Sequence, residues 1–127
     1  MSKEERKKKF AAALAATPGE SGESIVGRLW IERGGETIVS WARITLLERI
    51  DETGSISAAA RMLGISYTKA WRMVKDMNAH FGAPLVANTI GGPKGGGAAL
   101  TQEGREVVAR FRDLVERFKQ WLSEQTF

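Results

Sequence analysis

The chain has 127 residues, enough for one hydrophobic core but not for a second ligand-binding module of ordinary size. It has no cysteine and a single histidine, His80, which excludes a disulfide framework and leaves too few ligands for a zinc site. No apolar run approaches the roughly 20 residues of a membrane span, and the basic N-terminus lacks the apolar run of a signal peptide, so a cytoplasmic protein without a cofactor is expected.

The formal net charge of +4 is unevenly distributed. Residues 1–9 carry five basic and two acidic residues, residues 10–53 carry four and seven, residues 54–100 carry five and one, and residues 101–127 carry five of each. This asymmetry indicates that a polyanion faces the third segment, because counterion release on contact with phosphates favours Lys and Arg there.

In chain order, residues 1–24 are first basic, then Ala-rich, then turn-prone, which predicts a mobile arm and linker. The apolar and polar residues of Arg28–Ile31 and Glu36–Val39 alternate around Gly34-Gly35. This alternation predicts a hairpin of two short strands.

Two helices are expected next. The first spans Trp41–Thr53, with Ser40 as its N-cap and Gly54 at its end. The second is short, is capped by Ser57 and ends at Leu63.

Residues 54–85, GSISAAARMLGISYTKAWRMVKDMNAHFGAPL, have the small and apolar residues that a helix-turn-helix requires. Ala60 is small enough for the point where two helices cross. Gly64 is suited to the left-handed backbone that ends the short helix at Leu63, which is the first helix of the motif. Ile65 then inserts an apolar side chain. The second helix of the motif is expected over Ser66–His80, with Ser66 as its cap.

Three side chains point away from the apolar face of that helix at 100° per residue, namely Thr68, Arg72 and Lys75. Only Asp76 opposes their positive charge. A helix in the major groove needs such donors, because Arg reaches two acceptors of guanine while Lys and Thr bind phosphates or base edges. The DNA-binding residues predicted in this region are Ser55, Ser57, Ser66, Tyr67, Thr68, Lys69, Trp71, Arg72 and Lys75.

After Gly82, the sequence PLVANTIGGPKGGGAALT places two short apolar stretches around a Gly-rich loop, which predicts a β-hairpin wing. The glycines let the backbone approach a phosphate or a minor groove closely, and Lys94 supplies the charge. No Gly-Lys-Ser or Gly-Lys-Thr follows the loop, so it is not a Walker motif and no nucleoside triphosphate is expected.

From Thr101 onward, apolar residues recur at alternating spacings of four and three, which predicts a helix of about 20 residues with a wide apolar stripe. We interpret the stripe as a homodimer interface. A two-fold dimer would present two recognition helices to half-sites about one DNA turn apart. The predicted interface residues are Val107, Phe111, Leu114, Phe118 and Trp121. The alternative is that the stripe packs back on its own domain.

Three segments, LERIDETGSISAAARMLGISYTKAW, DMNAHFGAPLV and GGPKGGGAALT, together resemble the N-terminal DNA-binding domain of the molybdate-responsive transcriptional regulators, over about residues 27–118. The resemblance implies a winged helix-turn-helix that dimerises through flanking helical segments, a recognition helix that begins near SYTKAW, and an inverted-repeat operator. The stretch is also similar to the LysR-type regulators, whose pattern has an Arg where Arg72 stands but a small residue at Trp71. Members of the molybdate family carry C-terminal oxyanion-binding domains, and this chain has no room for them. No small-molecule effector domain is therefore expected.

These expectations give a mainly α fold with short β-hairpins, organised as an arm (1–24), a winged helix-turn-helix domain (25–100) and a dimerisation helix (101–127). The expected function is a sequence-specific bacterial transcription regulator that binds double-stranded DNA as a homodimer. An enzyme is not expected, because no nucleophile and base surround His80 and no second domain forms a cleft.

Two alternatives remain open at this point. In an architectural protein that coats DNA without reading it, the basic arm would matter more than Thr68 and Arg72. In a protein-interaction module, Trp71 and Tyr67 would face a partner. Several candidate residues also have simpler interpretations: Trp71 and Tyr67 as packing residues, the serines as helix caps, and Lys94 as part of a flexible loop tip.

Overall fold

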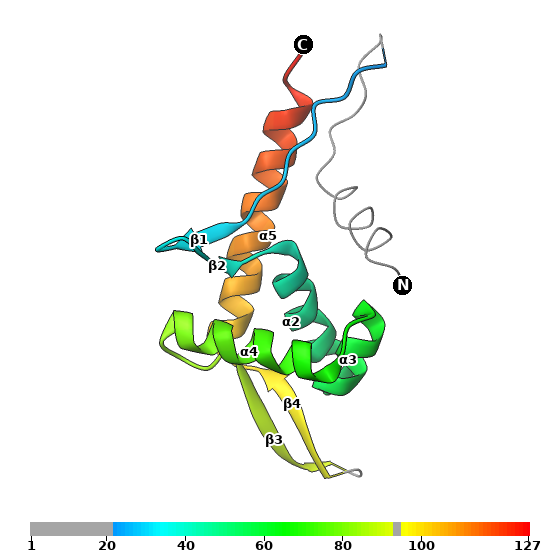
Figure 1. Ribbon diagram of the computed structural model, residues 1–127, viewed down its shortest axis with the longest axis vertical. Coiled ribbons are helices and arrows are strands. Elements are labelled where there is room, and N and C mark those ends of the chain that lie inside the picture. Colours follow the sequence, from blue (N-terminus) through cyan, green and yellow to red (C-terminus); the bar gives the residue numbers. More distant parts are fainter. Residues whose placement is uncertain (1–21, 93–94) are drawn as a thin grey trace.

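The computed structural model describes residues 22–92 and 95–127 of the chain (Figure 1). The prediction of a mobile arm therefore falls largely on residues that lie outside the described part. Within these ranges, four helices and two antiparallel strand pairs form a mainly helical fold, which confirms the predicted winged helix-turn-helix. In chain order the elements are β1 (Ile31–Arg33), β2 (Glu36–Val39), α2 (Trp41–Thr53), α3 (Ile56–Leu63), α4 (Tyr67–Phe81), β3 (Val86–Gly92), β4 (Gly95–Leu100) and α5 (Gln102–Ser123).

The first hairpin forms where the alternation predicts it, but its first strand begins at Ile31 instead of Arg28. Its turn places Gly34 at φ 58° and Gly35 at φ 83°, the left-handed values that a tight two-residue hairpin needs. The preceding segment does not pair in the hairpin and instead runs along α5 (Figure 1), where Gly27 lies against Phe118.

Helix α2 lies at the centre of the core. The Ser40 side chain accepts a hydrogen bond from the Arg43 backbone N–H at 3.3 Å, and Gly54 ends the helix in the left-handed conformation at φ 70°, as predicted. The helix contributes four buried side chains: Ile44, Leu46, Leu47 and Ile50. The other helices and the wing pack around this element.

Helix α3 begins two residues earlier than predicted, because Ser55 and not Ser57 is its N-cap. The Ser55 hydroxyl accepts from the Ala58 backbone N–H at 3.1 Å, whereas Ser57 lies exposed in the first turn. The Thr53 hydroxyl also donates to the Ser55 carbonyl at 3.0 Å and accepts from its N–H at 3.2 Å. These bonds fix the turn so that Ile56 packs against the core in the first turn of the helix. The prediction that Ser57 caps the helix is wrong.

This difference predicts unequal effects of two matched substitutions. Ser55→Ala should lower the free energy of unfolding by about 1 kcal/mol, the usual contribution of an N-cap. Ser57→Ala should change it by less than about 0.5 kcal/mol, because surface substitutions away from caps have little effect. Urea denaturation of the two variants provides the comparison, and an equal loss in both would contradict the cap assignment.

The turn between α3 and α4 has the geometry that the sequence predicts. Gly64 adopts φ 66°, and the Ile65 N–H donates to the Ala60 carbonyl at 3.0 Å, the long bond of a Schellman motif. Ala60 itself is 1% exposed. The Ser66 side chain then accepts from the Lys69 backbone N–H at 3.0 Å and caps α4. The direction of α4 is therefore fixed by local contacts at its start.

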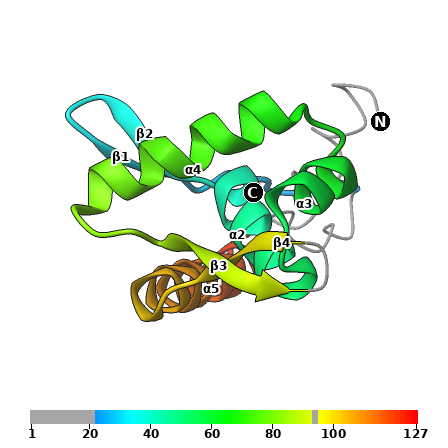
Figure 2. The same ribbon diagram turned by 90° about the horizontal axis from the view of Figure 1, so that it is seen from below.

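The wing is attached to the helix-turn-helix at its base. Strands β3 and β4 pair in antiparallel register, with Val86 opposite Leu100. The Ala98 N–H donates to the Gly54 carbonyl at 2.9 Å, which joins β4 to the turn between α2 and α3. A Cβ atom on Gly97 would lie 2.7 Å from that same carbonyl oxygen, so only glycine permits this approach. The wing thus leaves the body beside α4 (Figures 1 and 2).

Helix α5 begins at its N-cap Thr101, packs on α2, and continues beyond the globular body (Figure 1). Arg112 forms an ion pair with Glu48 of α2 and lies 4.3 Å from the centre of the Trp41 ring. In the described ranges, no helix is long and apolar enough to cross a membrane.

Candidate nucleic-acid interface

The outer side of α4 is lined by exposed donors. Thr68, Lys69, Arg72 and Lys75 are exposed, while the opposite face of the helix is buried. Within the described part of the chain, no carboxylate pairs with the Arg72 guanidinium. The structure therefore presents these side chains together on one surface, as the helical spacing predicts.

The negative charge of α4 is directed elsewhere. Asp76, the one acidic residue of this helix, lies 4.0 Å from Arg43 of α2. Most of the Arg43 side chain is buried, whereas that of Asp76 is half-exposed. This contact turns the carboxylate toward the body, which leaves the outer side of α4 with an uncompensated positive charge.

The two aromatic residues of α4 differ in their surroundings. Tyr67 is 55% exposed at the start of the helix. Trp71 is 47% exposed, and Lys75 places its Nζ atom 5.0 Å from the centre of the indole ring, a cation–π contact. Trp71 also lines a pocket, so packing and an exposed contact surface are combined in the same side chain.

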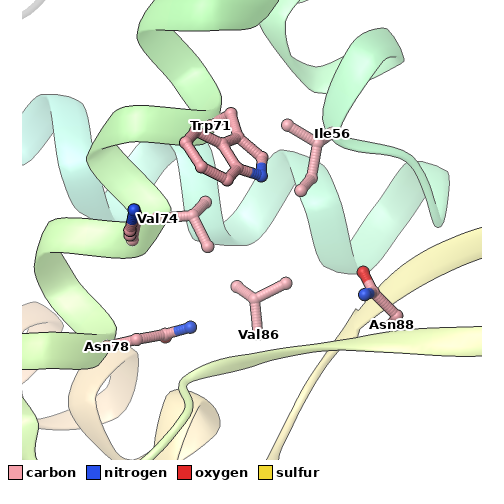
Figure 3. Close-up of a pocket in the computed structure, with 7 residues that line it drawn as sticks. Ile56, Trp71, Val74, Asn78, Val86 and Asn88 are labelled. Atoms are coloured by element: carbon pink, nitrogen blue, oxygen red, sulfur yellow. The ribbon is translucent and has the colours of Figure 1, made fainter.

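That pocket lies between α3, α4 and the wing strand β3 (Figure 3) and has a volume of about 220 Å³. Its lining residues are Ile56, Trp71, Val74, Lys75, Asn78, Val86 and Asn88. Of these, only Trp71 and Lys75 are among the predicted site residues. Asn78 and Asn88 were missed by sequence reasoning. The available signal was their spacing: Asn78 follows Trp71 by seven residues on the helix, and Asn88 alternates with Val86 on the strand.

The remaining predicted contact residues occupy other positions. Ser55 and Ser66 use their hydroxyls as helix caps, and Ser57 lies exposed in the first turn of α3. Lys94 lies outside the described residues. The prediction that this lysine contacts DNA stays a prediction.

The predicted dimer stripe on α5 is divided by the fold. Val107 (8% exposed) and Phe111 (2%) belong to the core of their own chain. Leu114 and Phe118 are partly exposed, and Trp121 is 55% exposed. The rings of Phe118 and Trp121 stack at a centroid distance of 6.4 Å. Of the predicted stripe, only Leu114, Phe118 and Trp121, toward the C-terminal end of the helix, keep exposed surface.

No group of three or more His, Cys, Asp or Glu side chains that could hold a metal ion occurs among residues 22–92 and 95–127. The outer side of α4 offers hydrogen-bond donors, positive charge and exposed aromatic side chains.

The comparisons with known proteins give a consistent result. Residues 41–105 match the model of the lysR family of bacterial regulatory helix-turn-helix proteins. The chain is 37% identical over 108 residues to the molybdenum transport protein ModE of Azotobacter vinelandii, a match that covers 80% of this chain and 40% of that protein. It is 42% identical over 100 residues to the molybdenum-pterin-binding protein MopB of Rhodobacter capsulatus, covering 79% of this chain and 36% of the relative. With the DNA-binding transcriptional dual regulator ModE of Escherichia coli the identity is 41% over 78 residues, covering 61% and 29%.

The chain thus spans 29% to 40% of the length of these relatives. The similarity confirms the resemblance drawn from the sequence motifs, and a regulatory family agrees with the expectation that the chain is not an enzyme.

Proposed function

Because this chain belongs to the lysR family of bacterial regulatory helix-turn-helix proteins, we propose that it regulates transcription in the cytoplasm by binding a specific DNA sequence as a homodimer. The observation that carries the proposal is the exposure of Thr68, Arg72 and Lys75 on one side of α4. Helix α4 lies beside the wing strands (Figure 2). In this arrangement α4 enters the major groove, and the wing lies over the adjacent backbone.

The division of labour follows from the chemistry of the donors. Arg72 reads base edges, because a guanidinium reaches both acceptors of a guanine. Lys69, Lys75 and the hydroxyls near the starts of α3 and α4 contact phosphates, which position the protein without reading sequence. Tyr67 and Trp71 lie at the border between these two kinds of contact.

Dimerisation rests on α5. Trp121 is a large apolar side chain exposed at 55%, stacked on Phe118 at a part of the helix that extends beyond the body (Figure 1). Exposed aromatic residues of this kind are typical anchors of protein interfaces. We propose that Leu114, Phe118 and Trp121 meet their copies in a second chain, which places two α4 helices on the half-sites of an inverted repeat.

Selection of bound duplexes from a random library at near-physiological salt, followed by sequencing, tests this function. An inverted repeat whose half-sites are about one DNA turn apart is the expected result. Retention of DNA without an enriched sequence would favour the architectural alternative. Failure to retain DNA would favour a protein partner on the Tyr67 and Trp71 surface.

Lys94 provides a test of the wing. Lys94→Ala should weaken binding to all duplexes alike and reduce the slope of log affinity against log salt by about one, because one phosphate contact is lost. Titrations at several salt concentrations, with the selected site and a scrambled duplex, measure both quantities. A changed base preference at an unchanged slope would contradict a phosphate contact by this lysine.

A further inference from the structure

The pocket between α4 and the wing is lined by polar side chains that all carry an N–H group. Four of its lining side chains carry N–H donors, namely Trp71, Lys75, Asn78 and Asn88, and none of its lining residues is acidic. The rest of the lining, Ile56, Val74 and Val86, is apolar. A site with several donors and no carboxylate suits an anion.

The side-chain amide of Asn78 has a fixed orientation. Its Oδ1 atom accepts a hydrogen bond from the Leu85 backbone N–H at 2.7 Å, which fixes the orientation of the side-chain amide. The Nδ2 group is therefore the part of the amide left to donate, and Figure 3 shows it turned toward Val86 on the pocket side. The same view shows the Trp71 indole nitrogen on the pocket side of its ring.

Positive charge is held beside these neutral donors. Lys75 keeps its Nζ atom 5.0 Å from the centre of the Trp71 ring, at the edge of the pocket. An anion that enters the pocket thus meets one ammonium group, two side-chain amides and one indole N–H. The single carboxylate of α4, that of Asp76, is paired with Arg43.

We propose that the pocket receives one phosphate group of the DNA backbone, on the strand that passes between α4 and the wing, and that Asn78 and Asn88 are donors to its oxygens. This inference rests on the proposed function. The apolar residues of the lining then pack against the adjoining sugar. A phosphate of the duplex is favoured over a free anion. Binding a free anion costs translational and rotational entropy that these few donors would have to offset alone. For a phosphate of bound DNA, the other protein–DNA contacts offset that cost.

The test uses Asn78→Asp in the full chain. Aspartate keeps the oxygen that accepts from the Leu85 N–H but replaces the amide donor by a negatively charged oxygen. The thermal stability should remain close to that of the wild type. The affinity for the selected duplex and for a scrambled duplex should fall by about tenfold or more in each case, because the donor to a charged group is lost and a carboxylate now repels the phosphate. Both duplexes are affected alike, because a phosphate contact carries no sequence information.

Gln120→Glu is the matched control, because it adds the same charge at an exposed position near the far end of α5 (Figure 1). It should leave the DNA affinity within about twofold of the wild type. Asn88→Leu is the second variant. It removes an exposed amide from the pocket without touching the bond to Leu85, and it should also lower the affinity for both duplexes.

Duplexes in which successive phosphates are replaced by neutral methylphosphonates identify the contact directly. At one phosphate position in each half-site, the methylphosphonate should lower the affinity of the wild type. At the same position it should cause no further loss in Asn78→Asp, because the DNA change and the protein change remove the same interaction. Wild-type affinity in both asparagine variants would overturn the inference while leaving the proposed function intact. Failure of the wild type to bind DNA would instead overturn the proposed function. Inorganic phosphate that saturates the wild type, with no effect of Asn78→Asp on DNA binding, would show that the pocket takes a free anion and would also overturn the inference.

Discussion

Replacement of Arg72 by alanine is expected to remove about 1–3 kcal/mol of the free energy of specific DNA binding, the scale of one good base contact. The fold should be unaffected, because the side chain is exposed and no carboxylate in the described residues pairs with it. The affinities for the selected duplex and for a scrambled duplex are measured at one salt concentration. Their ratio is the specificity, and its decrease from the wild type to the variant is the expected loss.

Arg110→Ala is the control for this variant. Arg110 is an exposed arginine on α5, so its removal changes the net charge equally without altering α4. The control should bind both duplexes as the wild type does. If Arg72→Ala keeps both the affinity and the base preference of the wild type, Arg72 is not a reader of sequence.

The expected effect of Arg72 depends on how firmly α4 is held. The inner side of the helix buries Ala70, Val74 and Met77. The turn before it is fixed by the backbone hydrogen bonds around Gly64 and by the Ser66 cap. A side chain on a rigid helix reaches base edges with less loss of entropy than one on a flexible loop. The Gly64 turn, which fixes the direction of α4, is therefore expected to contribute to specificity at the outer face of the helix.

Much of this fold was predictable from the sequence because its signals are local. Gly54 and Gly64 end helices by adopting positive φ, and Ser40 and Ser66 cap the helices that follow. The start of α3 was not predictable in the same way. Ser55 and Ser57 are equally good caps by residue type, and the choice depends on the Thr53 hydrogen bonds and on the packing of Ile56.

Part of the candidate site was also predictable from local sequence signals, and part was not. The exposed face of α4 follows from helical periodicity, and the structure confirms the exposure of Arg72 and Lys75. The pocket does not follow, because Asn78 and Asn88 come together only when the wing docks on the helices, and neutral amides leave no charge pattern in the sequence. A periodic stripe also cannot show what covers it, which is why Val107 and Phe111 belong to the core of their own chain.

Gly104→Ala is the second substitution for which we expect a large effect. Gly104 is buried in the first turn of α5, and a Cβ atom there would lie 2.2 Å from the Leu85 carbonyl oxygen and 3.4 Å from Leu100 Cβ. Alanine is favoured over glycine inside a helix by about 1 kcal/mol. The overlap with a backbone atom opposes this gain, because no rotamer change relieves it. We expect a net loss of about 2 kcal/mol in the free energy of unfolding.

Urea denaturation measures this loss, and Ala109→Gly at an exposed position of the same helix measures the helix-propensity contribution alone, with the opposite sign. A Gly104→Ala variant as stable as the wild type would show that the backbone at Leu85 can move away from the new Cβ atom without loss of stability. We expect this backbone segment to resist displacement. The Thr101 N–H donates to the Leu85 carbonyl at 3.0 Å, and the Thr101 hydroxyl donates to the Pro84 carbonyl at 2.6 Å. Since the Leu85 N–H also holds Asn78 in place, a displaced Leu85 would move the pocket donor as well. The same substitution should therefore weaken DNA binding in the molecules that remain folded.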